Sequence, residues 1–247
     1  MKKFMALLLV AGMTLSLTAC GGSTDTAKTD QADGKDTFTV GFDQDFPPFG
    51  YVGDDGEFTG FDIEMATECA ARMGKKIVLQ PIDWDAKDME LEAGTIDCIW
   101  NGFTMNGRED QYTWTDPYMD NSQVVVVKKD SGINTLADLA GKVVEVQKES
   151  AAETALNDEE HADLMASFAQ LLSVGEYNTA FMDLESGAVD AVAIDIGVAQ
   201  FQIEGKEDQY QILDETISSE QYAVGFFLGN TALRDEVQST LLEMVED

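Results

Sequence analysis

Hydrophobic and polar residues alternate at the start of the folded part of the chain. Residues 37–42 read TFTVGF, so that every second side chain is large and apolar. This period of two predicts a β-strand with one buried face. Two prolines follow within the segment DQDFPPF, residues 43–49, where they fix φ and exclude a helix. That segment is therefore expected to be a stiff loop, followed by a turn at residues 54–56.

Strands and helices then interleave along the rest of the chain. Asp62 is the expected N-cap of a helix that runs to about Met73 and stops at Gly74. Further strands are predicted at residues 77–82, 96–100, 124–127, 143–147, 171–174, 189–194 and 222–227. Further helices are predicted at residues 85–93, 136–139, 150–156, 176–185 and from 231 onward. Such alternation is typical of mostly parallel α/β sheets, and two similar sets of elements predict two lobes with a cleft between them.

The first residues of the chain have the pattern of a targeting segment. Two lysines precede an apolar run that is too short for a comfortable membrane span, and the run ends in LTACG. This ending resembles the bacterial lipobox, which implies cleavage before Cys20 and attachment of lipid to its sulfur. Residues 1–19 are then a lipoprotein signal peptide, and residues 20–36, which are almost free of apolar side chains, a flexible linker. Ordinary secretion with cleavage near Ala19 is the alternative.

Charge limits the partners that this protein can have. The chain has 247 residues, with 47 acidic against 15 basic side chains and a formal net charge of −32. Nucleic acids and anionic membrane surfaces would be repelled by such a protein. The only expected contact with the membrane is therefore the lipid anchor.

Enzyme and metal signatures are missing from the sequence. His161 is the single histidine, and besides Cys20 the chain has only Cys69 and Cys98, so a zinc site of the usual kinds is not expected. There is no Gly-x-Ser-x-Gly elbow, phosphate loop or dinucleotide fingerprint. We therefore expect no catalytic residues, no metal and no cofactor. Whether Cys69 and Cys98 form a disulfide or stay as buried thiols is left open.

The segment WNGFTMNGR, residues 100–108, is the strongest candidate for a binding site. It follows a predicted strand, and open α/β sheets bind small ligands at the carboxyl ends of their strands. Arg108 offers a planar fork that matches a carboxylate, and the backbone of residues 102–104 would assist it. The alternative is a surface arginine that pairs with Asp110 or Asp116.

Five segments together resemble one family. They are VGFDQDFPPFGY, GEFTGFDIEMA, WNGFTMNGRED with YTWTDPY, LADLAGKVVEVQKESAAE and LESGAVDAVAID, in this order. This pattern is similar to the extracytoplasmic solute-binding proteins of family 3, which serve polar amino-acid ABC importers, and it covers nearly all of residues 37–245. The resemblance implies two α/β lobes, each a mostly parallel sheet flanked by helices, joined by two hinge strands near residues 123–128 and 219–226. Lobe 1 would comprise residues 37–123 and 222–247, and lobe 2 residues 124–221.

The resemblance also implies roles for individual residues. Arg108 matches the arginine that holds the ligand α-carboxylate, and Asp195 the acid that receives the α-ammonium, with a helix N-cap as the alternative for Asp195. Supporting positions would complete the pocket. They are Thr104 and the Gly102 backbone in the carboxylate cradle, the N–H groups of Ser150 and Ala151 at a helix start, Phe46 against the ligand side chain, and Asp43, Trp84, Trp100 and Asn101 as walls. Trp100 could instead belong to the core, as is expected of Phe49.

The chain departs from the family pattern at three places. The loop from Thr104 to Arg108 is one residue shorter than the common form, which changes the details of the carboxylate grip. Glu145 and Glu149 stand where the family usually has glycine, and Ala151 replaces a frequent threonine, which removes a hydroxyl contact. The sequence stops at residue 247, inside the expected final helix, so that the packing of this helix is expected to be incomplete.

The function implied by the resemblance is that of an extracytoplasmic receptor of an ABC importer. A monomer, anchored by lipid to the bacterial cell membrane, would capture a free amino acid by hinge closure and deliver it to a permease. A ligand-sensing lipoprotein for a signalling partner is one alternative, and a lyase similar to cyclohexadienyl dehydratase on the same fold is another. The bound amino acid is left open, because Asp43 favours a basic side chain whereas the short loop and Asn101 suit a polar or sulfur-containing one.

Overall fold

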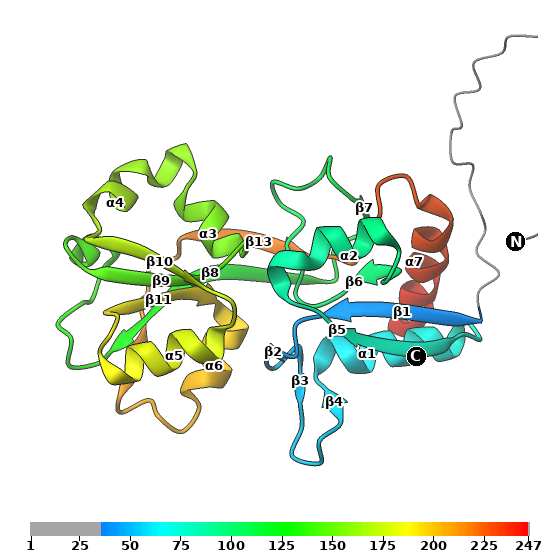
Figure 1. Cartoon of the computed structure of the whole chain (residues 1–247), viewed down its shortest axis with the longest axis horizontal. Coiled ribbons are helices and arrows are strands. Elements are labelled where there is room, and N and C mark those ends of the chain that lie inside the picture. Colours follow the sequence, from blue (N-terminus) through cyan, green and yellow to red (C-terminus); the bar gives the residue numbers. More distant parts are fainter. Residues whose placement is uncertain (1–35, 247) are drawn as a thin grey trace, which may run out of the picture.

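The computed structural model describes residues 36–246. The predicted signal peptide, the lipidation site Cys20 and the linker up to residue 35 lie outside the described residues. Within the part that is described, no helix is long and apolar enough to cross a membrane. Two sheets form two bodies side by side, connected by two long strands (Figure 1).

The first lobe is built on a five-stranded sheet with the order β5-β1-β6-β14-β7. Its strands are β5 (Lys76–Pro81), β1 (Thr37–Phe42), β6 (Cys98–Ile99), β14 (Gly225–Phe226) and β7 (Thr113–Trp114). The strands β5, β1 and β6 run parallel, whereas β14 is antiparallel to both of its neighbours. Four of the five strands therefore run in one direction, as predicted, and β14 alone runs against them because the chain returns to the sheet there from the other lobe.

Helices cover both faces of this first sheet. On one face, α1 (Phe61–Arg72) and α7 (Thr231–Val245) bury a core with Phe38, Val40 and the two free thiols of Cys69 and Cys98. Trp100 lies in the same core. On the other face, the short helix η1 (Trp84–Ala86) and α2 (Lys87–Ala93) pack with Ile99 and with several aromatic side chains.

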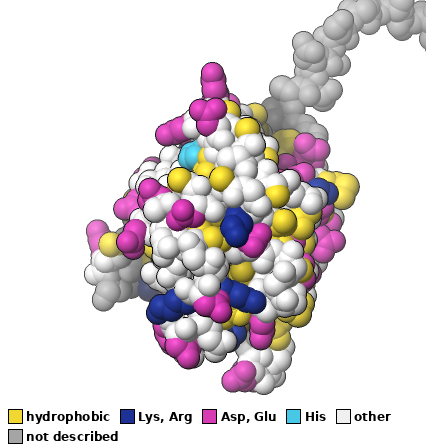
Figure 2. All heavy atoms as spheres, turned by 90° about the vertical axis from the view of Figure 1, so that its left-hand side faces the viewer, with side chains coloured by type: hydrophobic (Ala, Val, Ile, Leu, Met, Phe, Trp, Pro, Cys, Tyr) yellow, Lys and Arg dark blue, Asp and Glu magenta, His cyan; other side chains and the backbone are white. Residues whose placement is uncertain are grey.

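The second lobe is built on a sheet with the order β10-β9-β11-β8-β12. Its strands are β10 (Gln170–Val174), β9 (Val143–Gln147), β11 (Ala191–Asp195), β8 (Met119–Lys128) and β12 (Tyr210–Ile212). The first three run parallel, and β8 is antiparallel to β11 and β12. One face is covered by α5 (Tyr177–Ser186) and α6 (Ile196–Ile203), and the other by η2 (Leu136–Leu139), α3 (Ala151–Leu156), η3 (Glu159–His161) and α4 (Ala162–Ser167). Acidic side chains are scattered over the outer end of this lobe (Figure 2).

Two antiparallel strands connect the lobes. The first half of β8 pairs with β13 (Ser218–Tyr222), from Met119 opposite Tyr222 to Gln123 opposite Ser218. The second half of β8 belongs to the second sheet, and the chain passes from β13 into β14 of the first sheet (Figure 1). A small sheet of β2 (Asp45–Phe46), β3 (Gly50–Val52) and β4 (Phe58–Thr59) lies beside this crossing. The predicted lobe limits near residues 123 and 222 stay a prediction.

The largest local difference from the sequence prediction concerns Asp62. Helix α1 begins at Phe61 with Gly60 as its N-cap, so the prediction that Asp62 caps this helix is wrong. Gly60 has φ 125°, and a Cβ there would come within 2.4 Å of the carbonyl oxygen of Phe49, which leaves room for glycine alone. Asp62 is instead fully buried and accepts a hydrogen bond from the N–H of Gly102 at 2.6 Å.

Most other predicted elements are present, with changed limits. The predicted strand 222–227 is divided between β13 and β14, and the predicted strand 96–100 is reduced to β6. Helix α6 and strand β12 were not predicted. The helix α3 is as expected, because Ser150 is its N-cap and accepts a hydrogen bond from the N–H of Glu153 at 3.1 Å.

Candidate ligand-binding site

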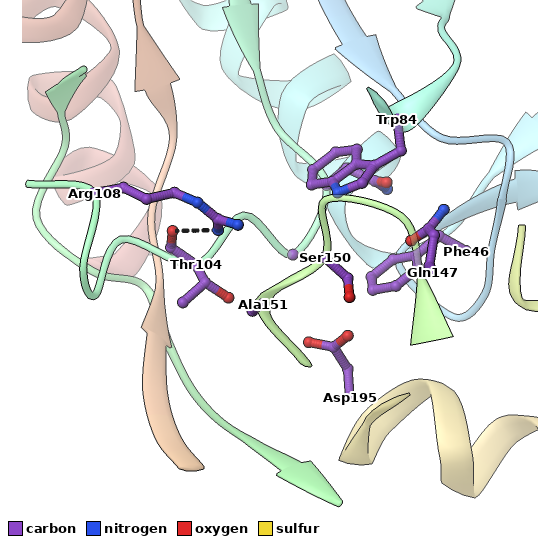
Figure 3. Close-up of a pocket in the computed structure, with 10 residues that line it drawn as sticks. Phe46, Trp84, Thr104, Arg108, Gln147, Ser150, Ala151 and Asp195 are labelled. Carbon is purple, nitrogen blue, oxygen red and sulfur yellow. Dashed lines mark hydrogen bonds between the residues drawn. The ribbon is translucent and has the colours of Figure 1, made fainter. Parts of the chain in front are cut away.

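A cavity of about 280 Å³, its mouth included, lies between the two lobes (Figure 3). The first lobe lines it with side chains from the loops after β1, β5 and β6, and the second with residues at the ends of β9 and β11. The lining residues are Phe46, Trp84, Asn101, Gly102, Thr104, Arg108, Gln147, Ser150, Ala151 and Asp195. Of the residues that the sequence proposed for the pocket, Asp43 and Trp100 are absent from this wall, Trp100 because it is buried in the core of the first lobe. Gln147 is an addition.

Arg108 reaches the cavity without an acidic partner among the described residues. Its guanidinium donates to the carbonyl oxygens of Thr104, at 3.2 Å, and of Glu149, at 3.3 Å, and lies 5.5 Å from the centre of the Phe103 ring. The alternative of an ion pair with Asp110 or Asp116 is not formed in this part of the chain. Two neutral carbonyl oxygens position the guanidinium but do not neutralise its charge, which can therefore attract an anionic ligand group.

Asp195 lies at the opposite side of the cavity, at the end of β11. It occupies the N-cap position of α6, but its side chain makes no capping hydrogen bond. Its Oδ1 atom accepts instead from Asn121 Nδ2 at 2.7 Å, from Gln123 Nε2 at 2.7 Å and from the Tyr222 hydroxyl at 2.5 Å. Burial raises the pKa of Asp195 to about 7, and the neighbouring carboxylate of Glu220 adds to this increase.

Two of the donors expected in the carboxylate cradle are already used. The N–H of Gly102 donates to Asp62 at 2.6 Å, and the hydroxyl of Thr104 donates to Glu220 Oε1 at 2.8 Å. Gly102 has φ 57°, and a Cβ there would lie 2.9 Å from the ring of Phe46, so the cavity wall requires a glycine at this position. Of the groups predicted for the carboxylate cradle, Arg108 and the start of helix α3 therefore remain to be considered.

The start of α3 supplies one of the two predicted backbone donors. The N–H of Ser150 donates to the carbonyl oxygen of Gln147 at 3.2 Å and is thereby engaged. Ala151 is the first residue of the helix, where an N–H has no partner within the helix, and it lines the cavity. Its N–H is the one that remains for a ligand.

Glu149, just before this helix, has an unusual backbone. Its φ is 57°, the left-handed region that favours glycine, and glycine is the residue that the family pattern predicts here. Its carboxylate pairs with Lys87 Nζ at 3.2 Å across the cleft, and beside it Lys148 pairs with Asp85 at 2.7 Å. Lys87 is buried and lies 5.2 Å from the centre of the Trp84 ring. The two lobes therefore touch around the cavity, as in a closed receptor.

Asp43 is set back from the cavity behind Gln147. The Nε2 atom of Gln147 donates to Asp43 Oδ2 at 2.6 Å and to the carbonyl oxygen of Gly175 at 2.8 Å. Burial raises the pKa of Asp43 to about 6. Asp43 lines a second hollow of about 1090 Å³, its space open to solvent included, which shares Trp84 with the first cavity. Its wall is acidic, with Asp43, Asp45, Asp83, Asp85, Glu90 and Glu176.

Several residues of the site were missed by the sequence prediction. Gln147 ends a parallel strand just before Ser150, and this position alone could have identified it. Asn121, Gln123 and Glu220 are polar residues inside the connecting strands, where a strand prediction does not say which side chains face the cleft. No group of three or more potential metal ligands occurs among residues 36–246.

Comparison with known proteins agrees with this architecture. The model of the bacterial extracellular solute-binding proteins, family 3, matches residues 38–247. The L-cystine-binding protein TcyJ of Escherichia coli (strain K12) is 30% identical over 246 residues, which cover 98% of this chain and 88% of the relative. The arginine-binding extracellular protein ArtP of Bacillus subtilis (strain 168) is 29% identical over 250 residues, which cover 100% of this chain and 94% of the relative.

A solved structure shows the same arrangement of lobes. An ABC uptake transporter substrate-binding protein from Streptococcus pneumoniae, with bound histidine, superimposes with a TM-score of 0.82 at 32% identity, and the match covers 86% of this chain and 88% of that one. The two-lobe α/β fold predicted from the sequence is thereby confirmed. The chain belongs to the bacterial extracellular solute-binding proteins, family 3.

Proposed function

We propose that this protein is the extracytoplasmic receptor of an amino-acid ABC importer. One free amino acid fills the cavity, with its carboxylate on Arg108 and its ammonium on Asp195. The observation that carries the proposal is the pairing of opposite charges in one enclosed space. Among residues 36–246, a guanidinium without an acidic partner and a buried carboxylate without a basic one line the same cavity from different lobes (Figure 3).

The energy needed for capture explains why both charges are required. Micromolar affinity corresponds to about 8 kcal/mol. A free amino acid has roughly ten heavy atoms, and small ligands gain at most about 1.5 kcal/mol per atom before ordering costs are subtracted. Both charged ends must therefore be bound in a closed and water-poor space, which the cross-cleft pairs of Glu149 and Lys148 help to close.

The relatives support an amino acid as the solute. Their names give L-cystine and arginine as ligands, and the pneumococcal structure holds histidine. The family consists of substrate-binding transport proteins, and we propose no catalysis for this chain. We also propose that it acts as a monomer that is held at the membrane by lipid on Cys20 and that releases its ligand to a permease.

Charge favours a basic side chain on the bound amino acid. The acidic cavity adjoins the ligand cavity at Trp84, and it has six carboxylates on its wall and no lysine or arginine among its lining residues. Asp85 is already paired with Lys148. A cationic side chain that displaces the Gln147 amide would reach Asp43 and pair with it. A neutral side chain would leave the hydrogen bond between Gln147 and Asp43 in place.

A thermal-shift screen against the twenty amino acids, L-cystine and L-ornithine tests the proposal, followed by titration calorimetry of the best ligand. We expect saturable 1:1 binding, with L-arginine, L-lysine or L-ornithine ahead of L-glutamine. A protein that binds none of these compounds contradicts the proposed function, as does turnover of prephenate or arogenate. Loss of amino-acid uptake on deletion of the gene distinguishes import from sensing.

Asp43→Asn tests the preference for a basic side chain separately. The substitution keeps a side-chain oxygen for Gln147 while it removes the charge. We expect affinity for L-arginine to fall about tenfold or more, on the scale of one charged hydrogen bond, with little change for a neutral amino acid. Equal losses for both ligands would show that Asp43 only supports the fold.

A further inference from the structure

Two buried carboxylates lie side by side at the hinge side of the cavity. Asp195 comes from β11, and Glu220 comes from the connecting strand β13. Both accept hydrogen bonds from the same two amides of β8. Asn121 Nδ2 lies 2.7 Å from Asp195 Oδ1 and 2.6 Å from Glu220 Oε1, and Gln123 Nε2 lies 2.7 Å from each of these oxygens. The two acids are therefore held as a pair.

This pair lacks a compensating cation. Asp195 is 4% exposed and Glu220 is 6% exposed, and neither forms an ion pair with a lysine or arginine in the described part of the chain. Two like charges in a low-dielectric space cannot both ionise readily. Neutral amides satisfy hydrogen bonds but remove no charge, so burial and the nearby carboxylate of Glu220 favour the protonated form of Asp195 in the empty site.

Glu220 also decides what Thr104 offers to a ligand. A threonine hydroxyl has one hydrogen, and that of Thr104 is donated to Glu220 Oε1 at 2.8 Å. Thr104 lines the cavity, so its oxygen is left there as an acceptor. All three hydrogen bonds to Asp195 reach Oδ1, which leaves Oδ2 as a second acceptor. An ammonium group, with three donors and no acceptor, is complementary to this arrangement.

We propose that Glu220 is a positioning residue of the ammonium site: it turns the Thr104 hydroxyl oxygen toward the ligand, and its nearby carboxylate favours on Asp195 a proton that the ligand ammonium displaces. The inference rests on the proposed function and deepens it. In the empty site, below about pH 7, Asp195 holds this proton. When an ammonium enters, that proton leaves to water and Asp195 becomes negatively charged, so the total charge of the site stays the same.

The groups around the pair determine the pH at which this proton is lost. Tyr222 from β13 and Tyr177 from α5 face Asp195, and burial raises the pKa of both so that they stay neutral. From β8 come only the amides, and Arg108 lies across the cavity. Burial raises the pKa of Asp195 to about 7, with Glu220 contributing. The proton is therefore expected to be lost between about pH 6 and pH 8.

Titration calorimetry measures the proton directly. The probe is the amino acid with the largest shift in the screen above, which is L-arginine on the charge argument, titrated into the full protein in buffers of different ionisation enthalpy. For a pKa of about 7, we expect about 0.9 protons released per ligand at pH 6, about 0.5 at pH 7 and about 0.1 at pH 8. Tight binding without proton release at pH 6 and pH 7 would overturn the inference but leave the proposed function intact. Failure of every amino acid to bind would instead defeat the proposed function.

Glu220→Gln separates a charge from a merely structural role. The amide keeps an oxygen as acceptor for Thr104, Asn121 and Gln123, so the network can form without the second charge. We expect fewer protons released at pH 7, a shift of the affinity profile to lower pH, and about tenfold weaker binding at pH 8. An unchanged pH profile would refute the role of Glu220. Glu145→Gln is the matched control, because Glu145 is also a buried acid with a raised pKa but does not line the cavity.

Thr104 provides a second and independent variant. Thr104→Val removes the hydroxyl at nearly constant volume, and we expect about tenfold weaker binding of the same probe. Thr104→Ser restores an oxygen that can donate to Glu220, and it should return affinity to within about threefold. Equal affinities for the valine and serine variants would contradict the proposed contact.

Discussion

Replacement of Arg108 by alanine is the most direct test of how this receptor holds its ligand. The guanidinium donates to two neutral carbonyl oxygens, those of Thr104 and Glu149, and has no acidic partner among residues 36–246. Its charge is therefore free for a ligand carboxylate. Arg108→Ala removes this charge, while Asp195, the proposed partner of the ligand ammonium, keeps its hydrogen bonds.

The size of the effect follows from what remains in the cavity. The N–H groups of Gly102 and Ser150 are already bonded, so of the three predicted backbone donors only the Ala151 N–H is left for the carboxylate. A carboxylate in a closed cavity without its partner costs about 2–5 kcal/mol. At about 1.4 kcal/mol per tenfold change, this corresponds to a loss of affinity of about thirtyfold to several thousandfold. Arg108→Lys keeps the positive charge but loses the planar guanidinium, so its affinity for the ligand should lie between those of the unmodified protein and Arg108→Ala.

Titration calorimetry with the best amino acid of the screen measures this loss. Arg72→Ala is the matched control, because it removes one arginine that pairs with Glu68 on the surface of α1. The melting temperature of ligand-free Arg108→Ala should stay within a few degrees of the unmodified protein, since only two hydrogen bonds to carbonyls are lost. Near-normal affinity in a folded Arg108→Ala protein would refute the assignment of Arg108 to the ligand carboxylate.

Two further predictions concern stability. Glu149→Gly should raise the free energy of unfolding of the ligand-free protein by about 1 kcal/mol, because a φ of 57° suits glycine. The same variant should weaken amino-acid binding a few-fold, because Lys87 loses its partner across the cleft. Glu149→Gln should weaken binding without the gain in stability; urea unfolding measures the stability and titration calorimetry the affinity. Burial raises the pKa of Asp62 to about 7 in the folded protein from 3.8, so its contribution to stability is full below about pH 4 and is lost as the pH rises through 7. Asp62→Asn should flatten that decline in urea unfolding between pH 5 and pH 8, and an unchanged slope would contradict the assignment.

The sequence determined those features whose cause lies within a few residues. Helix α3 begins after Ser150 because a serine oxygen can accept from an N–H three residues later. Helices α2 and α5 end at Gly94 and Gly187, both in the left-handed conformation that glycine adopts easily. The predicted strand β9 has the same limits in the structure. The resemblance to the family also identified Arg108 and Asp195 as candidate binding residues, and in the structure both line one cavity.

Tertiary structure decided the direction of the hydrogen bonds in the site. The sequence placed Gly102 and Thr104 in the carboxylate cradle, but Asp62 takes the N–H of Gly102 and Glu220 takes the hydrogen of Thr104. These partners are 40 and 116 residues away in the chain, so no local pattern reveals them. A donor has one hydrogen to give, and which acceptor receives it depends on the packing of distant segments. The sequence therefore indicated which residues to expect around the cavity, whereas the hydrogen-bond partners of those residues depend on how the connecting strands bring Glu220, Asn121 and Gln123 behind Asp195.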